Sequence, residues 1–275
     1  AMNNGMWKAP ATQANMATLR DRGVHVVGPG SGYLACGDVD TGRMSEPEDI
    51  VEAICEVLNP VPQDLAGKRI VITAGPTHEP IDPVRFIGNR SSGKMGIALA
   101  GKAARRGAEV TLVLRPTSLD VPRGVACVSV QTAAEMLQAA LSAFQTADAA
   151  ICAAAVADYT PAAPADHKLK KANERLDRIE LVETVDILAE LSRQKGDRLV
   201  IGFAAETDNV VKYAERKLAR KGCDAIIAND VSRADSGFGT DTNKAWIVST
   251  TGTKELPVLT KPQLADTILD LLQNL

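Results

Sequence analysis

Apolar runs alternate with amphipathic stretches along most of this 275-residue chain. Some runs, such as Ala149–Ala155 and Leu199–Ala205, are apolar at nearly every position, which is typical of strands buried on both faces of a mainly parallel sheet. The stretches between them repeat apolar residues at helical spacing. This alternation predicts an α/β protein with a doubly wound, Rossmann-like sheet, whose ligands bind beyond the carboxyl ends of its strands.

The expected elements fall into two groups separated by a linker. Residues 1–58 hold a helical stretch at 11–23, a glycine-rich loop around Cys36 and a helix at 46–58. Residues 59–67 carry two prolines and a glycine without periodicity, as linkers do. In the second domain, 68–275, we expect strands at 69–75, 109–115, 125–131, 149–155, 178–182, 199–205 and 224–229, then a hairpin-like pair at 245–250 and 255–259. Its expected helices are 94–106, 133–146, 186–195, 209–221 and 262–273.

Composition narrows the class of protein. A net charge of −3 and an aromatic content of 3% argue against a nucleic-acid groove, which needs basic and stacking side chains. No apolar run approaches the roughly 20 residues that cross a bilayer, and no signal segment opens the chain. The five cysteines form no C-x-x-C pair. We therefore expect a cytoplasmic protein with free thiols and no membrane partner.

The most informative segment is the long polar loop between the expected strand at 69–75 and the helix that follows it. Its candidate binding residues are Gly75, Ser91, Ser92, Gly93 and Lys94. The backbone N–H groups of such a loop and of a helix N-terminus are unpaired and attract anions, which predicts a phosphate or nucleotide site. It is not a P-loop, because Met95 stands where a P-loop has a magnesium-binding Ser or Thr.

A second polar loop follows the expected strand at 149–155. It begins at Asp158 and ends in three lysines, Lys168, Lys170 and Lys171. A carboxylate there can bind ribose hydroxyls or Mg²⁺, and a lysine flap can neutralise charge that develops at phosphorus. The alternative is a solvated loop with surface lysines.

The strand at 199–205 and the helix after it supply further candidates. Phe203 lies late in the strand, where it either stacks on a base or belongs to the core. Lys217 and Lys221 are four residues apart and share one helical face. That face either holds a ligand or is simply solvated.

These segments together resemble phosphopantothenoylcysteine synthetase, the partner that bacteria fuse to a decarboxylase in a bifunctional coenzyme A biosynthesis protein. The matching stretches are Ile72–Thr77, Asp82–Gly96, Ala154–Tyr159, Lys168–Lys171, Gly202–Thr207 and Ala228–Asp230. The resemblance implies a phosphopantothenate–cysteine ligase that works as a homodimer through the synthetase domain, within a higher oligomer of the full-length protein. The carboxylate of 4′-phosphopantothenate would attack the α-phosphorus of CTP with Mg²⁺, and the amine of L-cysteine would then displace CMP.

The resemblance also implies roles for individual residues. Lys168 matches the lysine needed to form the acyl-cytidylate, Asn89 the asparagine that handles this intermediate, and Arg85 an active-site arginine. The implied nucleotide contacts are Ala154, Ala155, Asp158, Val185, Asp186, Ile187, Leu188, Phe203, Lys217 and Lys221. The family often has Asn-Pro-Asp-Ile near the triphosphate, whereas this chain has Thr184-Val185-Asp186-Ile187, so the cap and the turn there differ. The ligands of Mg²⁺ are not identified by the sequence.

Residues 1–58 resemble the end of the flavin-dependent phosphopantothenoylcysteine decarboxylase. Asn3 matches its substrate clamp, and Cys36 matches the proton-donating cysteine of its flap. The earlier flavin-binding half is not in this chain, and the complete domain is what binds FMN. We therefore expect Asn3 and Cys36 to be vestigial here, with no flavin bound and no decarboxylase activity.

Two other classes remain as alternatives. An NAD- or flavin-binding oxidoreductase is disfavoured because the G-x-G-x-x-G fingerprint is missing and because hydride transfer does not require a lysine flap. A non-catalytic nucleotide-binding regulatory domain is the third possibility. Release of pyrophosphate from CTP upon addition of phosphopantothenate separates the ligase from both.

Overall fold

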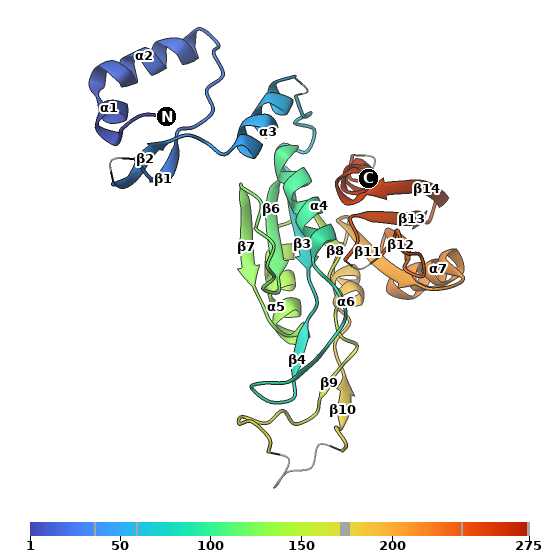
Figure 1. The fold of residues 1–275 in the computed structure, drawn as a ribbon. Coiled ribbons are helices and arrows are strands. Elements are labelled where there is room, and N and C mark those ends of the chain that lie inside the picture. The colour runs from blue at the N-terminus through green and yellow to red at the C-terminus, as the bar shows by residue number, and fades with distance from the viewer. Residues whose placement is uncertain (36, 59, 171–176, 238, 274–275) are drawn as a thin grey trace. The chain divides into compact units, whose positions relative to one another are not determined.

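The computed structural model describes residues 1–35, 37–58, 60–170, 177–237 and 239–273 (Figure 1). The chain divides into two compact units, Ala1–Pro62 and Gln63–Leu275. Within these described ranges, no helix combines the length and the apolar character needed to cross a membrane.

The first unit consists of three helices and a hairpin. Its elements are α1 (Asn4–Lys8), α2 (Pro10–Asp21), β1 (Gly30–Tyr33), β2 (Val39–Arg43) and α3 (Pro47–Leu58). Asp40 of β2 accepts hydrogen bonds from Lys8 at 2.5 Å and from Asn4 at 3.2 Å, which joins α1 to the hairpin. The hydrogen bond from Lys8 contributes most to lowering the pKa of Asp40 to about 2.

The expected glycine-rich loop of this unit contains the β1–β2 hairpin, which the sequence pattern did not predict. The reason is that β1 has the sequence Gly-Ser-Gly-Tyr, and glycine is poor in strands and has no side chain to show alternation. Asn3 caps α1, because its side chain accepts a hydrogen bond of 2.8 Å from the backbone N–H of Gly5. Cys36 lies outside the described residues.

The second unit is built on an eight-stranded sheet with the order β14-β13-β12-β11-β8-β3-β6-β7. Its strands are β3 (Arg69–Ala74), β6 (Glu109–Leu114), β7 (Val125–Ser129), β8 (Ala149–Cys152), β11 (Leu199–Glu206), β12 (Ala225–Asp230), β13 (Thr242–Ser249) and β14 (Gly252–Thr260). The six strands from β12 to β7 are parallel, and β13 and β14 complete the sheet as an antiparallel pair. The doubly wound α/β class and the C-terminal hairpin are therefore confirmed.

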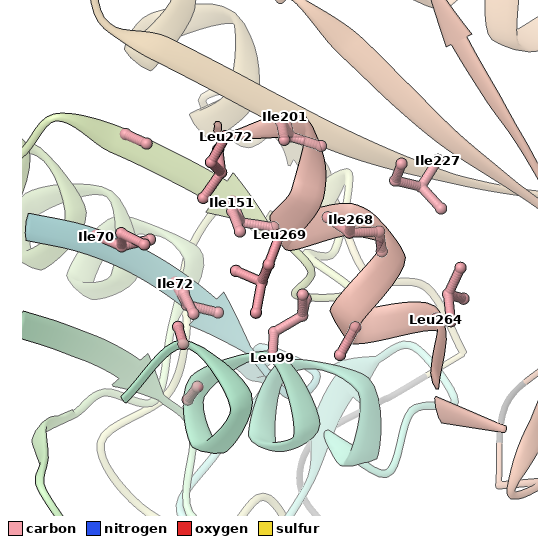
Figure 2. Packing of buried hydrophobic residues seen from close by; sticks show 14 of the residues in the cluster. Ile70, Ile72, Leu99, Ile151, Ile201, Ile227, Leu264, Ile268, Leu269 and Leu272 are labelled. Atoms are coloured by element: carbon pink, nitrogen blue, oxygen red, sulfur yellow. The ribbon is translucent and has the colours of Figure 1, made fainter. Parts of the chain in front are cut away.

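Helices cover both faces of this sheet. The helices α4 (Lys94–Arg105) and α8 (Lys261–Leu271) pack on one face, and α5 (Ala133–Phe144), α6 (Ile187–Arg193) and α7 (Val210–Lys221) on the other. Figure 2 shows Leu99 of α4 beside Leu269 of α8, and both belong to one cluster with Ile70 and Ile72 of β3. Val71, between those two isoleucines, belongs to the cluster on the opposite face, as the two-residue period of a strand requires.

The strand order reverses beside β3. The chain first adds β6 and β7 on one side of β3 and then returns to place β8 on its other side. A crevice forms at the carboxyl ends of two parallel strands whose connections leave in opposite directions. The ends of β3 and β8 are therefore the place to look for a ligand site.

Two short antiparallel ribbons project beyond the sheet (Figure 1). They pair β4 (His78–Pro80) with β5 (Phe86–Gly88), and β9 (Tyr159–Pro161) with β10 (Leu181–Glu183). The strand expected at 178–182 corresponds to β10, which lies in this separate ribbon and not in the central sheet. The sequence did not predict β4, β5 or β9, because three-residue strands among prolines and charges are too short to show a period.

The second unit begins inside the segment expected to be a linker, 59–67. From Gln63 onward the chain belongs to the second unit, and Leu65 is only 1% exposed within its core. Asp64 and Arg106 also form an ion pair of 2.8 Å. Leu65 and Asp64 therefore fix this part of the segment to the α/β unit.

The contact between α4 and β3 provides a test of the fold. A Cβ at Gly96 would lie 2.3 Å from the Cβ of Ala74, so Gly96→Ala should push α4 away from the strand. We expect a loss of about 1–3 kcal/mol in the free energy of unfolding, measured by urea denaturation. In the same helix, a Cβ at Gly101 would approach only Pro122, at 3.3 Å. Gly101→Ala should be neutral or stabilise by up to about 1 kcal/mol, and equal stability of the two variants would contradict this packing.

Candidate active site

A cavity of about 800 Å³ lies at the carboxyl ends of the central strands. Its walls come from the loop before α4, the segment after β8, the start of α6, the end of β11, one side of α7, and the residues around β13 and the start of α8. The cavity thus collects side chains from helices on both faces of the sheet. Its position agrees with the reversal of strand order beside β3.

Most of the residues expected at the site line this cavity. They are Asn89, Ser91, Ser92, Gly93, Lys94, Ala154, Ala155, Asp158, Val185, Asp186, Ile187, Leu188, Phe203, Lys217 and Lys221. Gly75, Arg85 and Lys168 are not among the lining residues. Gly75 lies behind the loop, since a Cβ at Gly93 would be 3.5 Å from its Cα.

The loop before α4 leaves its backbone donors available. Gly93 is the N-cap of α4, with a φ of 78° and no side-chain cap, and this left-handed conformation favours glycine. The Ser91 hydroxyl is 3.4 Å from the Gly93 nitrogen and the Ser92 hydroxyl is 3.5 Å from the Lys94 nitrogen, so both contacts are long for hydrogen bonds. The loop therefore presents N–H groups that an anion can take up.

Two loops are held together at the mouth of the cavity. The side-chain amide of Asn89 donates a hydrogen bond of 2.8 Å to the carbonyl of Val156. The Thr77 hydroxyl accepts one of 2.9 Å from the backbone N–H of Ala157. The segment that follows β3 and the segment that follows β8 thus support each other, which fixes the position of Asn89.

The basic face of α7 turns into the cavity. Lys217 Nζ donates a hydrogen bond of 2.8 Å to the carbonyl of Phe203, and burial lowers the pKa of Lys217. Lys221 forms an ion pair with Asp186, whose carboxylate also caps α6 by accepting from the Ala189 N–H at 2.9 Å. The sequence left open whether this face holds a ligand or is simply solvated. Because both lysines lie in the cavity with partners, they are not simply solvated.

Phe203 belongs to the core, as one of its two interpretations expected, and it also reaches the cavity, while its stacking on a base stays a prediction. It packs against the core cluster that contains Leu99, and part of it also lines the cavity. A partly exposed aromatic face at the end of a strand can stack on a planar ligand while its other atoms stay in the core.

Other cavity residues limit the possible chemistry. Burial raises the pKa of the Cys152 thiol to about 12, so this cysteine is neutral at physiological pH and is not a thiolate nucleophile. Among the residues that the structure describes, no three or more His, Cys, Asp or Glu side chains form a metal-binding group.

Arg85 contacts the lysine-bearing flap outside the cavity, at the residue after Lys168. The buried carboxylate of Asp82 accepts from the Arg85 guanidinium and, at 3.2 Å, from the backbone N–H of Leu169. Arg85 in turn donates to the carbonyl of Leu169 at 2.9 Å. This Asp82–Arg85 pair grips the residue next to Lys168, while the Lys168 side chain is exposed. Lys171 lies outside the described residues.

Sequence reasoning missed several cavity residues. Asn229, Asn243 and Lys261 line the side near α8. Asn229 is the second-last residue of β12 and falls in the matching stretch Ala228–Asp230, but it was not named as a site residue; the rule that found Asp158 would have found it. Lys261 gives no such signal, because a lysine at the start of an amphipathic helix is usually solvated.

Comparison with known proteins identifies the family. The model described as the DNA/pantothenate metabolism flavoprotein C-terminal domain matches residues 65–275, and the model described as flavoprotein matches residues 1–59. The coenzyme A biosynthesis bifunctional protein CoaBC of Bacillus subtilis is 47% identical over 272 residues, which cover 98% of this chain and 67% of that protein. The chain belongs to the CoaBC family. The resemblance inferred from the motifs is thereby confirmed.

Solved structures agree with this assignment. The crystal structure of a CoaBC C-terminal domain is 45% identical, covers 77% of this chain and 96% of that chain, and gives a TM-score of 0.65. A Cab2 mutant solved in complex with phosphopantothenate-cysteine is 16% identical, covers 84% of this chain and 95% of that chain, and gives a TM-score of 0.60. At that identity, the Cab2 structure shows the shared fold alone.

The hydrogen bond by which Asp82 holds the flap at Leu169 is testable. An Asp82→Asn variant loses the charge and must turn an NH₂ group toward one set of N–H donors. We expect the amide of Leu169 to exchange with solvent about 10–100-fold faster, because a hydrogen bond to a charged group contributes about 1.5–3 kcal/mol. Asp166→Asn is the matched control, since the Asp166 side chain is 98% exposed and pairs with His167. An unchanged exchange rate at Leu169 in Asp82→Asn would show that this hydrogen bond does not hold the flap.

Proposed function

We propose that the chain is a phosphopantothenate–cysteine ligase that uses CTP. The observation that carries the proposal is the cavity, which brings the anion-binding loop before α4 together with the basic face of α7. The family membership supports it, because the relatives are named for coenzyme A biosynthesis. A ligase that joins two small molecules at the expense of a nucleotide needs one cavity with sites for several anions.

The first step activates the acid. A carboxylate oxygen of 4′-phosphopantothenate attacks the α-phosphorus of CTP, the bond between that phosphorus and the bridging oxygen breaks, and pyrophosphate leaves. The product is a mixed anhydride of the acid with cytidylate. Negative charge accumulates on the departing phosphates, and cations placed at those oxygens lower the barrier.

The second step makes the amide. The free amine of L-cysteine attacks the acyl carbon of the anhydride, and CMP leaves with the electrons of the carbon–oxygen bond. The amine loses one proton to solvent or to the departing phosphate. Asn89 would orient the anhydride, and the hydrogen bond to Val156, which holds its amide at the cavity mouth, supports this role.

The residues of α7 suit the nucleotide. Lys217 and Lys221, with Arg220 beside them, line one side of the cavity and would hold the triphosphate. Lys221 would exchange its pairing with Asp186 for a phosphate oxygen. Asp158 can accept from ribose hydroxyls, and the exposed part of Phe203 can stack on the base.

Mg²⁺ fits this arrangement as a partner of the triphosphate. Asp158 and Asp186 both line the cavity and offer carboxylate oxygens, and the phosphates would supply the remaining ligands. When bound, the cation would neutralise phosphate charge. The role of the protein is to supply those carboxylates and to orient the phosphates with Lys217 and Lys221.

We assign the first unit to a reaction other than the ligation. The flavoprotein model matches residues 1–59, and we propose that this segment completes the FMN-dependent decarboxylase domain. In the described part of the segment, Asn3 serves as the cap of α1. The ligase chemistry draws only on residues of the second unit.

The function is tested by the release of pyrophosphate. The purified chain with CTP and Mg²⁺ should release pyrophosphate only when 4′-phosphopantothenate is added, and cysteine should then sustain turnover. Replacing CTP by ATP should lower kcat/KM by up to about 10⁴-fold, the scale that buried hydrogen bonds to a base can reach. Absence of acid-dependent pyrophosphate release would refute the ligase, and equal kcat/KM for the two nucleotides would refute the choice of CTP.

Lys168 is expected to act in the first step. A lysine on the flap would bring an ammonium over the α-phosphate and neutralise charge that develops there. Lys168→Gln should lower the rate of pyrophosphate release about 10²–10³-fold, the scale for loss of one preorganised electrostatic contact. The matched control is Lys254→Gln, on exposed β14, which should keep the wild-type rate. A wild-type rate in Lys168→Gln would remove this lysine from the chemistry.

A further inference from the structure

The ribbon of β4 and β5 carries a stacked pair of rings. His78 begins β4 and Phe86 begins β5, and their ring centroids lie 3.5 Å apart with 13° between the ring planes. The guanidinium of Arg115, which follows β6, lies 2.7 Å from His78 Nδ1. These three residues are not among those that line the cavity.

The hydrogen bond from Arg115 fixes the protonation of His78. A guanidinium can only donate, so Nδ1 accepts, and the ring is neutral with its proton on Nε2. Partial burial and then the charge of Arg115 lower the pKa of His78, while the charge of Glu79 in β4 acts in the opposite direction. Stacking on the uncharged Phe86 favours an imidazolium only weakly, because Phe86 is 51% exposed. The neutral ring is therefore the form that this contact holds.

The backbone on both sides of this hydrogen bond is anchored. Thr77, just before His78, is completely buried, and the His78 N–H donates to the carbonyl of Gln131 at 2.9 Å. The Arg115 N–H donates to the carbonyl of Ala74, at the end of β3, at 3.3 Å. The imidazole thus stands between two fixed parts of the α/β unit.

Gly88 connects this ring to the candidate active site. It is the partner of His78 in the ribbon, and a Cβ at Gly88 would lie 2.8 Å from the Thr77 carbonyl oxygen and 3.1 Å from His78 Cδ2. The edge of the ring therefore lies directly against the Gly88 backbone. Asn89 is the next residue, and its amide donates to the carbonyl of Val156 at the mouth of the cavity. A movement of the ring would shift Gly88 and Asn89 together.

We propose that His78 is a positioning residue for Asn89. The ring, held by Arg115 and Phe86, supports the backbone before Asn89 and thereby sets the place of the Asn89 side chain. This inference rests on the proposed function, in which Asn89 orients the acyl-cytidylate for attack by cysteine. His78 lies outside the cavity and acts only through Asn89. Its loss should therefore slow the second step of the ligation and leave the first step nearly intact.

Protonation of His78 would remove this support. An imidazolium has two N–H donors and no acceptor, so it cannot take the hydrogen bond from Arg115, and two positive charges would then face each other. Because the pKa of His78 in the folded protein lies below the ordinary value of 6.5, the stabilising contribution of the ring is complete above pH 6.5. It is lost as the pH falls through the lowered pKa. The second step should slow over the same range.

The test pairs two variants of His78. His78→Asn keeps an acceptor near the position of Nδ1 and does not titrate, whereas His78→Phe keeps a ring that stacks but removes the acceptor. In rapid-quench experiments with CTP and 4′-phosphopantothenate, His78→Phe should pass acyl-cytidylate to cysteine up to about 10²-fold more slowly, the scale for a misplaced reacting group. Pyrophosphate release in its first turnover should stay within about threefold of wild type. At neutral pH, His78→Asn should keep the second step within about threefold of wild type.

The pH profile gives a reading that a merely structural role would not move. Below pH 6.5, the second step of the wild type should slow relative to that of His78→Asn, by up to about tenfold per pH unit once the ring is protonated. Their ratio cancels the titration of cysteine and of the phosphates, which both reactions share. Arg115→Met should raise the pKa of His78, measured by NMR of the ring, because a positive neighbour is lost. The matched control is His25→Asn, at an exposed histidine of the first unit, which should behave as wild type.

NMR of the Asn89 side-chain NH₂ group supplies a reading that needs no turnover. Its signal should move with the protonation of His78 in the wild type and stay fixed in His78→Asn, and a melting curve verifies that each variant is folded. Equal slowing of both steps in His78→Phe would overturn the inference, as would a pH profile that the wild type and His78→Asn share. Missing pyrophosphate release in the wild type bears on the proposed function, whereas an Asn89 signal that ignores the protonation of His78 rejects the positioning role.

Discussion

The close approach of α4 to β3 is the constraint on which the site depends. Gly96 faces Ala74 where no side chain fits, and Gly93 passes close to Gly75. Because the backbones meet at this distance, the first turn of α4 points over the end of β3 and into the crevice. A bulkier residue at either place would move the anion-binding loop, Lys94 and the helix α8 that packs on α4.

Electrostatics organise the cavity around that frame. Two of the carboxylates near it are already engaged: Asp186 caps α6 and pairs with Lys221, and Asp241 pairs with Lys94. Lys217 and Lys261 have neutral partners instead, and burial lowers the pKa of each. Such an imbalance is expensive in an empty protein. It becomes favourable when anionic substrates enter, which is how a binding site differs from a structural ion-pair network.

The sequence predicted the fold class because its strands are buried on both faces and read as continuous apolar runs. It also predicted Asp158 and Lys217 as candidate site residues, since Asp158 follows a strand and Lys217 lies on a basic helical face, and the family resemblance added Asn89. It did not predict β4, β5 or β9, whose three-residue pairings are decided by tertiary contacts. Nor did the sequence predict Lys261 as a cavity residue. Burial of a lysine at the start of a helix depends here on the packing of α4 against α8, which no local sequence pattern shows.

The packing of α4 against α8 also bears on the order of folding. Lys94 and Asp241 are 147 positions apart, whereas neighbouring parallel strands such as β6 and β7 are joined by short connections. Contacts between distant parts of a chain carry a larger loop-closure cost and tend to form late. A chain with its parallel strands already assembled would therefore still lack half of its cavity. Because Lys261 at the start of α8 lines the cavity, the cavity is complete only after α8 has docked, and docking of α8 marks the point at which the folded sheet gains its candidate active site.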